Sequence, residues 1–424
     1  MPLGVGVIGA GTVGGGVIEA LLKNTPVIHD KTGMDVALVH VAELNQANLA
    51  GFDLEGVTVS QDAAALIADP RVQVVCELIG GEEPAKTFIL QALNSGKHVV
   101  TANKMLLAKH GIELNNVAVK NNVELRFEAA VAGTIPIIKA IRESLASNHI
   151  LGIYGILNGT CNYIFSKMTY EEQEFDDVLL QAQQAGYAET PPDLDILGWD
   201  TAHKAQILAS LAYCTKVDLG EIYVEGITKV TQLDVSYARE MGYLIKLLAI
   251  IRKVDGELDV RVHPTLVPDD YLLAYVRDAF NAVYVESDVA GSTLYYGQGA
   301  GRKPTASAVV ADIIDIATHG DGPYPPPFQY THHLTVRDIG LLRGRYYLRM
   351  STKDHPGVLG RISTILGQHG VSIASVIQKE EDENVQAHII MMTHETLESS
   401  IMTALAEIDS QDFVTEPTHA MRVF

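Results

Sequence analysis

The stretch LDILGWDTAHK, residues 194–204, sets charged side chains among apolar and small ones. Asp200 and Lys204 are four positions apart, so on a helix they would share one face. An exposed pair of this kind contributes only about 0.3–0.5 kcal/mol. In a desolvated cleft the same pair can prepare the lysine for proton transfer, which accelerates a reaction roughly 10²–10⁴-fold. Asp200 can also cap a helix that continues through Thr215. Spacing alone leaves both interpretations open, and His203, turned to another side of the helix, is expected to be a bystander.

A second lysine, Lys104, ends the strand-like segment VVTANK. In parallel sheets, ligands bind beyond the carboxyl ends of the strands, so Lys104 there would meet substrate or cofactor. The alternative is a solvated surface lysine. Cys161, in NGTCNY, has the chemistry of a nucleophile but no base near it in the sequence. A small buried residue is the expectation for Cys161.

The segment VGVIGAGTVG, residues 5–14, contains a GxGxxG pattern between a strand-like run and a helix-like run. Such glycines let the backbone turn tightly and approach a pyrophosphate, which the helix N-terminus stabilises. The segment therefore predicts a dinucleotide-binding loop; the alternative is a turn whose glycines serve packing alone. Glu43 ends the next strand-like run and can accept hydrogen bonds from ribose hydroxyls. Ala42 precedes it and no arginine stands beside it, which favours NAD over NADP. The cofactor-binding candidates are Gly9, Gly11, Thr12, Val13, Gly14, Glu43 and Lys104.

Small residues dominate EAAVAGTIP, residues 128–136, which lets the chain pass close to another segment. Glu128 and nearby backbone carbonyls could bind a hard cation through oxygen. From spacing alone, a tight crossover between two domains is the favoured interpretation.

The elements that must position these residues follow a regular order up to residue 130. Short runs of apolar, β-branched residues alternate with helix-like segments, and the runs lack polar alternation, as parallel strands covered on both faces do. We predict an α/β fold with a Rossmann-like doubly wound parallel sheet over residues 1–130. The expected strands are GVGVIGAG, DVALVHVAE, VQVVCELIG, KHVVTANK and VELRFEAAV; the expected helices are TVGGGVIEALLKN and EPAKTFILQALNSGK.

Two further units are expected. Residues 131–320 predict an α+β domain with a returning helix. Its helices are expected in TIPIIKAIRESLAS, DDVLLQAQQAG, DTAHKAQILASLAYCT and GQGAGRKPTASAVVADIIDIA, and its strands in HILGIYGILNG and DVRVHPTLV. Pro and Gly mark residues 321–345 as a linker. Residues 346–424 predict a C-terminal ferredoxin-like (βαββαβ) domain, whose first helix has Pro356 in its first turn and Gly370 at its end.

Composition narrows the class of protein. A chain of 424 residues with 47% hydrophobic residues is expected to be globular with two or three domains. A formal net charge of -21 disfavours nucleic acid as a partner. The three cysteines share no CxxC spacing, which fits a reduced cytoplasmic setting. We expect neither a signal peptide nor a membrane span.

Taken together, the chain resembles homoserine dehydrogenases that carry a C-terminal ACT domain. The resemblance covers nearly the whole chain, and its motifs occur in the family's order and spacing. It rests on GxGxxG, VVTANK, EAAVAGTIP, LNGTCNYI, GYAETPPDLDILGWDTAHKAQILASLA and GAGRKPTASAVVAD, with DHPGVLGRISTILGQHGVSIAS for the ACT domain. It implies the reversible NAD(P)-dependent reduction of L-aspartate 4-semialdehyde to L-homoserine, in threonine, methionine and isoleucine biosynthesis.

The resemblance also implies residue roles. Lys204 is the proton donor to the carbonyl oxygen, and Lys104 lies near cofactor and substrate. The implied substrate-binding residues are Glu189, Asp195 and Asp200. The implied ligands of a sodium ion are Glu128, Val131, Gly133 and Ile135, which reverses the preference from spacing, and Gly301 falls in the turn that contacts the nicotinamide half of the cofactor.

The ACT domain implies feedback by an amino-acid effector such as threonine. The family implies that residues 131–320 are the catalytic and dimerisation domain, and that the protein is a homodimer or homotetramer. Two departures stand out. Many members carry Arg at the position of Ala42, and many read EADP where this chain has ETPP, residues 189–192. Two rival functions remain. A catalytically dead amino-acid sensor would show damage at Lys104, Asp200 or Lys204, and a phosphorylating semialdehyde dehydrogenase would need an activated cysteine and phosphate.

Overall fold

The computed structural model describes residues 2–188, 190–319, 328–378 and 386–424. They form two compact units. The first comprises the described residues of Met1–Gly159, Asp200–Glu221 and Phe280–Leu334, and the second those of Thr160–Trp199, Ile222–Ala279 and Thr335–Phe424. The domain boundaries expected from the sequence, near residues 130, 320 and 345, stay predictions. In the described part of the chain, no helix is long and apolar enough to cross a membrane.

The first unit contains the predicted doubly wound sheet. All its neighbouring strands pair in parallel, in the order β3-β2-β1-β4-β5-β6. The fully apolar runs form the central strands because helices cover both faces. The sequence did not reveal β3, which is short and largely exposed. The strands are β1 (Leu3–Ile8), β2 (Val36–Ala42), β3 (Thr58–Ser60), β4 (Val74–Glu77), β5 (His98–Thr101) and β6 (Leu125–Arg126).

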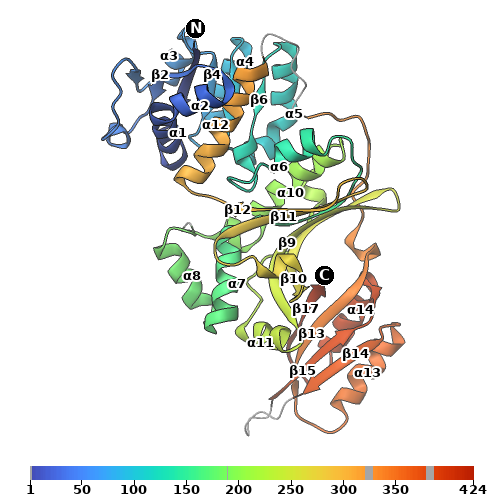
Figure 1. Ribbon diagram of the computed structural model, residues 1–424. Helices are drawn as coiled ribbons and strands as arrows, with labels where there is room; N and C mark the ends of the chain where they lie inside the picture. The colour runs from blue at the N-terminus through green and yellow to red at the C-terminus, as the bar shows by residue number, and fades with distance from the viewer. Residues whose placement is uncertain (1, 189, 320–327, 379–385) are drawn as a thin grey trace. The chain divides into compact units, whose positions relative to one another are not determined.

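The returning helix α12 (Arg302–His319) packs beside the first helix α1 (Thr12–Lys23), as the orange and dark blue helices of Figure 1 show. The two helices approach closely because Gly16 has no side chain. A Cβ atom there would lie 2.4 Å from the carbonyl oxygen of Arg302. Val309 and Ile313 of α12 belong to the same core as the strands of this sheet. The other helices of this part are α2 (Thr25–Thr32), α3 (Ala63–Ala68), α4 (Ala85–Asn94) and α5 (Lys104–Lys120).

The rest of the first unit supplies an antiparallel ladder and two helical segments. The ladder runs β12 (Gly291–Gln298), β11 (Phe280–Ser287), β7 (Ile150–Ile156), and the helical segments are α6 (Ile137–Lys139), continued by a π turn over Ala140–Ser144, and α10 (Trp199–Ala212). The helix expected over residues 134–147 is shorter. Pro136 stands at its N-cap position, and a proline disfavours helical backbone at the residue before it, so the helix begins only at Ile137.

Helix α10 also differs from its predicted bounds. It begins at Trp199, so Asp200 lies inside the first turn and does not precede the helix as a cap. It ends at Ala212 and does not reach Thr215. Cys214 has a left-handed backbone (φ 48°), which breaks the helix, and Thr215 instead forms a β-bridge with His332.

The second unit is built on one mixed sheet with the strand order β9-β10-β17-β13-β15-β14. Its first part carries the short strand β8 (Tyr223–Val224) on β10. The elements of that part are α7 (Gly159–Glu171), α8 (Phe175–Gln184), α9 (Asp193–Ile196), α11 (Gln232–Glu240), β9 (Tyr243–Val254) and β10 (Glu257–Pro268).

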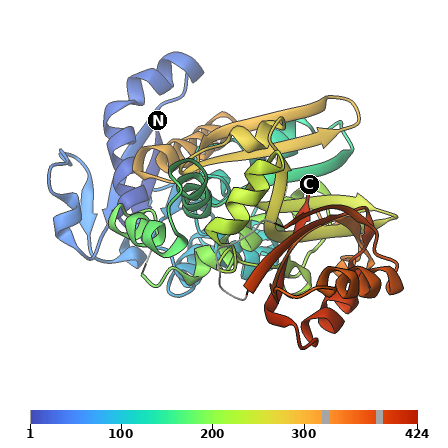
Figure 2. The same cartoon turned by 90° about the horizontal axis from the view of Figure 1, so that it is seen from below.

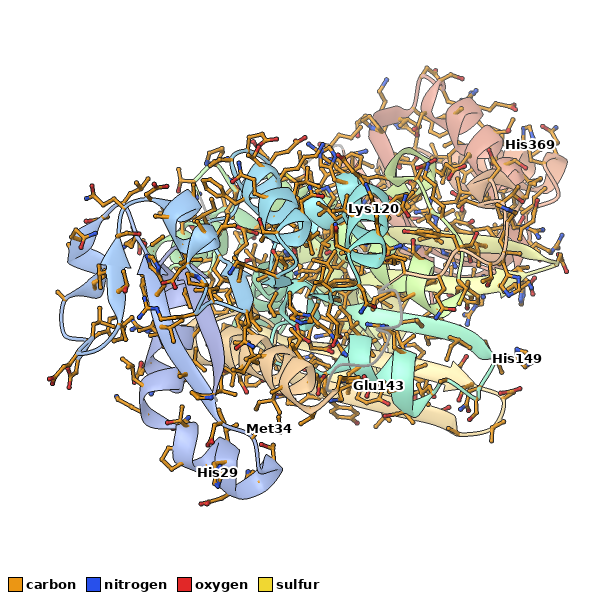
Figure 3. All side chains as sticks on the ribbon, turned by 90° about the horizontal axis from the view of Figure 1, so that it is seen from above. His29, Met34, Lys120, Glu143, His149 and His369 are labelled. Atoms are coloured by element: carbon orange, nitrogen blue, oxygen red, sulfur yellow. The ribbon has the colours of Figure 1, made fainter. Side chains whose placement is uncertain are left out.

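The C-terminal part of this unit has the predicted βαββαβ order. Its elements are β13 (Arg343–Lys353), α13 (Val358–Gln368), β14 (Ile373–Gln378), β15 (Gln386–Thr393), α14 (Glu398–Asp409) and β17 (Val414–Val423). The red strands and helices of Figure 2 show both helices on one side of the sheet. His369, labelled in Figure 3, follows α13 and pairs with Glu407 of α14 at 2.8 Å. Pro356 is not in the first turn: α13 begins at Val358, after Gly357 in the left-handed region (φ 93°).

Candidate active site

Asp200 and Lys204 form a buried pair on α10. Both residues are less than a tenth exposed. The Lys204 ammonium donates to Asp200 Oδ2 at 2.7 Å and to the carbonyl oxygen of Leu157 at 2.6 Å. The pair is therefore desolvated, and it is not the exposed ion pair that spacing also allowed. Carbonyl and carboxylate together hold the ammonium in one place, where a reacting group could meet it.

Asp200 collects further partners. Its Oδ1 lies 3.1 Å from the Lys104 ammonium, and Asn158 Nδ2 donates to its Oδ2 at 2.9 Å. Burial alone would raise the pKa of Asp200. The Lys204 and Lys104 charges and the hydrogen bonds from Lys204 and Asn158 outweigh burial and hold that pKa well below its usual range. The carboxylate thus stays ionised at neutral pH.

Three chain segments distant in sequence bring these groups together. Lys104 is the first residue of α5, directly after β5, and Asn103 caps that helix by accepting the N–H of Leu106. Asn158 follows β7, and Asp200 opens α10. Asn158 was not predicted from the sequence, although it lies in the same stretch, NGTCNY, as Cys161. The signal was a polar amide directly after a strand.

Other residues of the same stretches take different places. Cys161 is fully buried, as expected, and its Sγ lies 3.3 Å from the carbonyl oxygen of Asp195. Asp195 is on α9 in the second unit and is half-buried. Glu189 lies outside the described residues. Burial lowers the pKa of His203, against the opposing charge of Asp200, so this imidazole is neutral at pH 7.

The predicted cofactor loop is tight at one glycine and open at another. Gly9 has a left-handed backbone (φ 90°), and a Cβ on Gly14 would lie 1.8 Å from the Gly9 carbonyl oxygen. A Cβ on Gly11 would meet nothing within 4 Å. Thr12 and Val13 open α1. The loop therefore needs Gly14 for its own packing, whereas Gly11 leaves space at the helix N-terminus, where a pyrophosphate is stabilised.

Glu43 follows β2 and is nearly buried. Its Oε2 accepts the N–H of Ala10 at 2.5 Å, and its Oε1 accepts the N–H of Asn45 at 2.7 Å. Each oxygen keeps one lone pair for another donor. Glu43 thus ties the end of β2 to the glycine loop. Gly301 precedes α12 and has a positive φ of 127°.

The segment after Glu128 is a close crossover between two parts of the first unit. The Glu128 carboxylate accepts the N–H groups of Ile138 and Lys139, each at 2.8 Å, and burial raises its pKa to about 7. A Cβ on Gly133 would lie 2.4 Å from the carbonyl oxygen of Gly299. The carbonyl of Ile135 accepts the N–H of Ile137 at 2.8 Å.

Two carbonyls of this crossover differ from that of Ile135. Within the described ranges, no N–H or hydroxyl donates to the carbonyl oxygens of Val131 and Gly133, and both residues are buried. No group of three or more His, Cys, Asp or Glu side chains suited to a metal occurs among the residues described. A cation here would therefore depend on backbone oxygens.

Comparisons with known proteins agree over the whole length of the chain. Family models described as "Homoserine dehydrogenase, NAD binding domain", "Homoserine dehydrogenase" and "ACT domain" match residues 9–128, 136–314 and 346–412. The homoserine dehydrogenase of Neisseria gonorrhoeae is 44% identical over 100% of this chain and 98% of that protein. That of Pseudomonas aeruginosa is 42% identical over 100% and 99%.

Solved structures give the same result. The crystal structure of a homoserine dehydrogenase from Thiobacillus denitrificans superposes with a TM-score of 0.93 at 43% identity, covering 100% of this chain and 98% of that one. A hyperthermophilic archaeal homoserine dehydrogenase in complex with NADPH has a TM-score of 0.64 at 25% identity, covering 77% and 99%.

Proposed function

The chain belongs to the homoserine dehydrogenase family, and we propose that Lys204, Asp200 and Lys104 form its reaction centre. The enzyme is an NAD(P)-dependent oxidoreductase that acts on the hydroxyl group of L-homoserine and forms L-aspartate 4-semialdehyde. The observation that supports the assignment is the Lys204 ammonium, buried between Asp200 and the Leu157 carbonyl.

In this proposal Lys204 donates the proton during reduction and accepts it during oxidation. The bound nicotinamide supplies the hydride for reduction. As the carbonyl carbon receives it, the carbonyl oxygen gains negative charge, which the Lys204 ammonium stabilises. Lys204 then gives a proton to that oxygen, and the hydroxyl of homoserine forms. Asp200 does not compete as the acid, because its pKa is held low. In the oxidation direction the neutral amine of Lys204 takes the hydroxyl proton.

The acidic residues serve substrate binding. The substrate carries an ammonium, which carboxylates bind, and we assign this task to Glu189, Asp195 and Asp200. Lys104, beside Asp200 at 3.1 Å, is assigned to the cofactor and substrate side of the centre.

The test is the Lys204→Ala variant beside Lys216→Ala, whose side chain is more than half exposed. Lys204→Ala is expected to keep NAD binding and to lose roughly 10²–10⁴-fold in turnover, and Lys216→Ala to keep both. Initial rates of L-homoserine oxidation are measured without phosphate, which a phosphorylating enzyme would require. Near wild-type turnover of Lys204→Ala would refute the assignment.

For the cofactor we propose a preference for NAD, bound by Gly9, Gly11, Thr12, Val13, Gly14, Glu43, Lys104 and Gly301. Glu43 stands where a 2′-phosphate would be repelled, and Ala42 offers it no positive charge. Initial rates with NAD and NADP at equal concentration test the preference. Equal rates with both cofactors would contradict it.

We also propose a sodium ion on the crossover at Glu128, Val131, Gly133 and Ile135. The donor set fits a hard monovalent cation: two buried carbonyls receive no hydrogen bond from the residues that the structure describes, and the Glu128 oxygens have lone pairs left. Such an ion would fix the crossover between β6 and α6. Thermal unfolding in sodium chloride and in choline chloride at equal ionic strength tests it, with a higher midpoint expected in sodium.

For the ACT domain we propose binding of an amino-acid effector, threonine being the first candidate. The loop from β13 to α13 borders a cavity of roughly 490 Å³, lined by residues 352–359 with Gln378 and Ile389. Calorimetric titration with L-threonine tests this. We further propose a cytoplasmic homodimer or homotetramer serving threonine, methionine and isoleucine biosynthesis, with light scattering after size exclusion as the test of assembly.

A further inference from the structure

Within the second unit, residues 224–227, called here the turn after β8, support the segment that carries Asp195, residues 193–198. The N–H of Ile227 donates to the carbonyl oxygen of Ile196 at 2.8 Å. A Cβ on Gly226 would lie 2.3 Å from that same oxygen, so the two backbones touch without a side chain between them. Gly198 has a φ of 86°, and a Cβ on it would lie 3.1 Å from a methyl group of Val224. The position of residues 193–198 therefore follows the position of residues 224–227.

Arg422, on the last strand β17, holds that turn in place. Glu225 Oε2 accepts a hydrogen bond from Arg422 Nη1 at 2.9 Å and another from the Tyr223 hydroxyl at 2.9 Å. Arg422 Nη2 donates to the Tyr223 oxygen at 3.1 Å, and the guanidinium lies 4.6 Å from the centre of the Tyr223 ring. Charge-assisted hydrogen bonds of this kind are the strong ones, so they fix the turn.

The other edge of the same guanidinium contacts an acidic residue of the C-terminal domain. Arg422 Nε donates to Glu398 Oε2 at 3.0 Å, and Nη2 donates to Glu398 Oε1, which makes the pair bidentate. Glu398 opens α14 and also accepts the Tyr346 hydroxyl. Arg422 and Glu398 are both buried. One arginine thus bridges an acid of the C-terminal domain and the acid that holds the turn.

We propose that Arg422 and Glu225 are positioning residues for the substrate. The pair holds residues 224–227, and these hold the Asp195 segment in the geometry that binds substrate. The inference rests on the substrate role proposed above for Asp195. Lys204 is held separately, by Leu157 and Asp200, so the proton-transfer step is independent of the pair.

The arrangement also connects the C-terminal cavity with the substrate segment. Strand β13 runs from Thr352, which lines that cavity, to Tyr346, which is paired with Arg422 across the β13–β17 ladder. The six residue steps between Tyr346 and Thr352 span about 20 Å. The cavity and Arg422 thus contact the same strand at two places.

The test is Glu225→Gln, with Glu221→Gln as the matched control. Glu221 is exposed and lies four residues earlier in the chain. Glu225→Gln is expected to raise KM for L-homoserine about 2- to 30-fold, the range that mutations in such coupling networks produce. Its kcat and its KM for NAD are expected to stay within about twofold, because the pair touches neither the proton donor nor the cofactor loop. Glu221→Gln is expected to change none of these values.

Arg422→Met is expected to raise KM at least as much, since it also releases Glu398. Should that variant fold poorly, Glu225→Gln still decides, because it leaves the Arg422–Glu398 pair in place. An unchanged KM in Glu225→Gln, or a loss confined to kcat, would overturn the inference.

A double-mutant cycle with Asp195→Asn separates this inference from the function it rests on. If the pair acts through Asp195, Glu225→Gln adds no further increase in KM to the Asp195→Asn variant. Independent, additive increases would overturn the inference. If Asp195→Asn leaves KM unchanged while Glu225→Gln raises it, the support of the segment stands and the assigned role of Asp195 fails.

Discussion

Replacing Asp200 by Asn tests the central pair of the site directly. The substitution keeps the shape of the side chain but removes the negative charge that contacts both Lys204 and Lys104, at 2.7 and 3.1 Å. The new amide can still accept hydrogen bonds through its single oxygen. Its NH₂ group, however, is a donor and would face an ammonium. The two ammonium groups would then lose the carboxylate that both of them contact.

The expected loss is large because the Lys204 pair is buried. At an effective dielectric constant of about 20, charges 2.7 Å apart attract by roughly 6 kcal/mol, of which desolvation cancels a part. Removing one partner of a buried pair costs about 3–5 kcal/mol. The Lys104 pair adds less, since that lysine side chain is 37% exposed and water screens it. We therefore expect Asp200→Asn to lower the free energy of unfolding by about 3–5 kcal/mol.

The control is Asp218→Asn in the same unit. Asp218 pairs with Lys216 at 2.6 Å, but both side chains are more than half exposed. An exposed pair contributes about 0–1 kcal/mol, so this variant should be nearly as stable as the wild type. Urea unfolding can be followed through Trp199, the chain's one tryptophan, which directly precedes Asp200. Equal losses in the two variants would refute the reasoning.

The pH dependence gives a second criterion for Asp200. Its folded-state pKa is lowered, so its contribution to stability is complete above the unfolded value of about 3.9 and is lost as pH falls through the folded value. The difference between wild type and Asp200→Asn is therefore expected to be constant from neutral pH down to about pH 4 and to shrink below it. A difference that grows on acidification would contradict the assigned charge state.

Three further outcomes are expected. Gly14→Ala should weaken NADH binding, measured by fluorescence titration, because its Cβ would lie 1.8 Å from the Gly9 carbonyl oxygen; Gly344→Ala, with open space around it, should not. Burial lowers the pKa of Lys246 to about 7, so the unfolded chain binds the extra proton from about pH 7 to about 10.4. Stability should rise over that interval, and Lys246→Met should abolish the rise in urea midpoint. Burial alone would raise the pKa of Asp234, but His419 and Arg349 outweigh burial and lower it. Asp234→Asn should therefore reduce stability at neutral pH, and progressively less below about pH 4.

Much of the fold could be predicted from the sequence because its signals are local. Unbroken β-branched runs mark strands buried on both faces, and the returning helix and the βαββαβ order follow from periodicity. The elements that were predicted wrongly are those for which the local sequence carries no signal. β3 is short and largely exposed, so it carries no apolar signal. α10 stops at Ala212 because Cys214 takes a left-handed backbone, which nothing in its neighbours' propensities requires.

The site divides differently between sequence and structure. Helical spacing established that Asp200 and Lys204 share a face, and motif order established the family. Whether that face is dry, and which groups meet it, depends on segments far apart in the chain. The end of β5 brings Lys104, the end of β7 brings Asn158 and the Leu157 carbonyl, and only their convergence removes water and lowers the pKa of Asp200. The sequence thus determined which charges lie side by side, and the tertiary structure decided that they are desolvated, because burial is a property of packed segments and not of spacing.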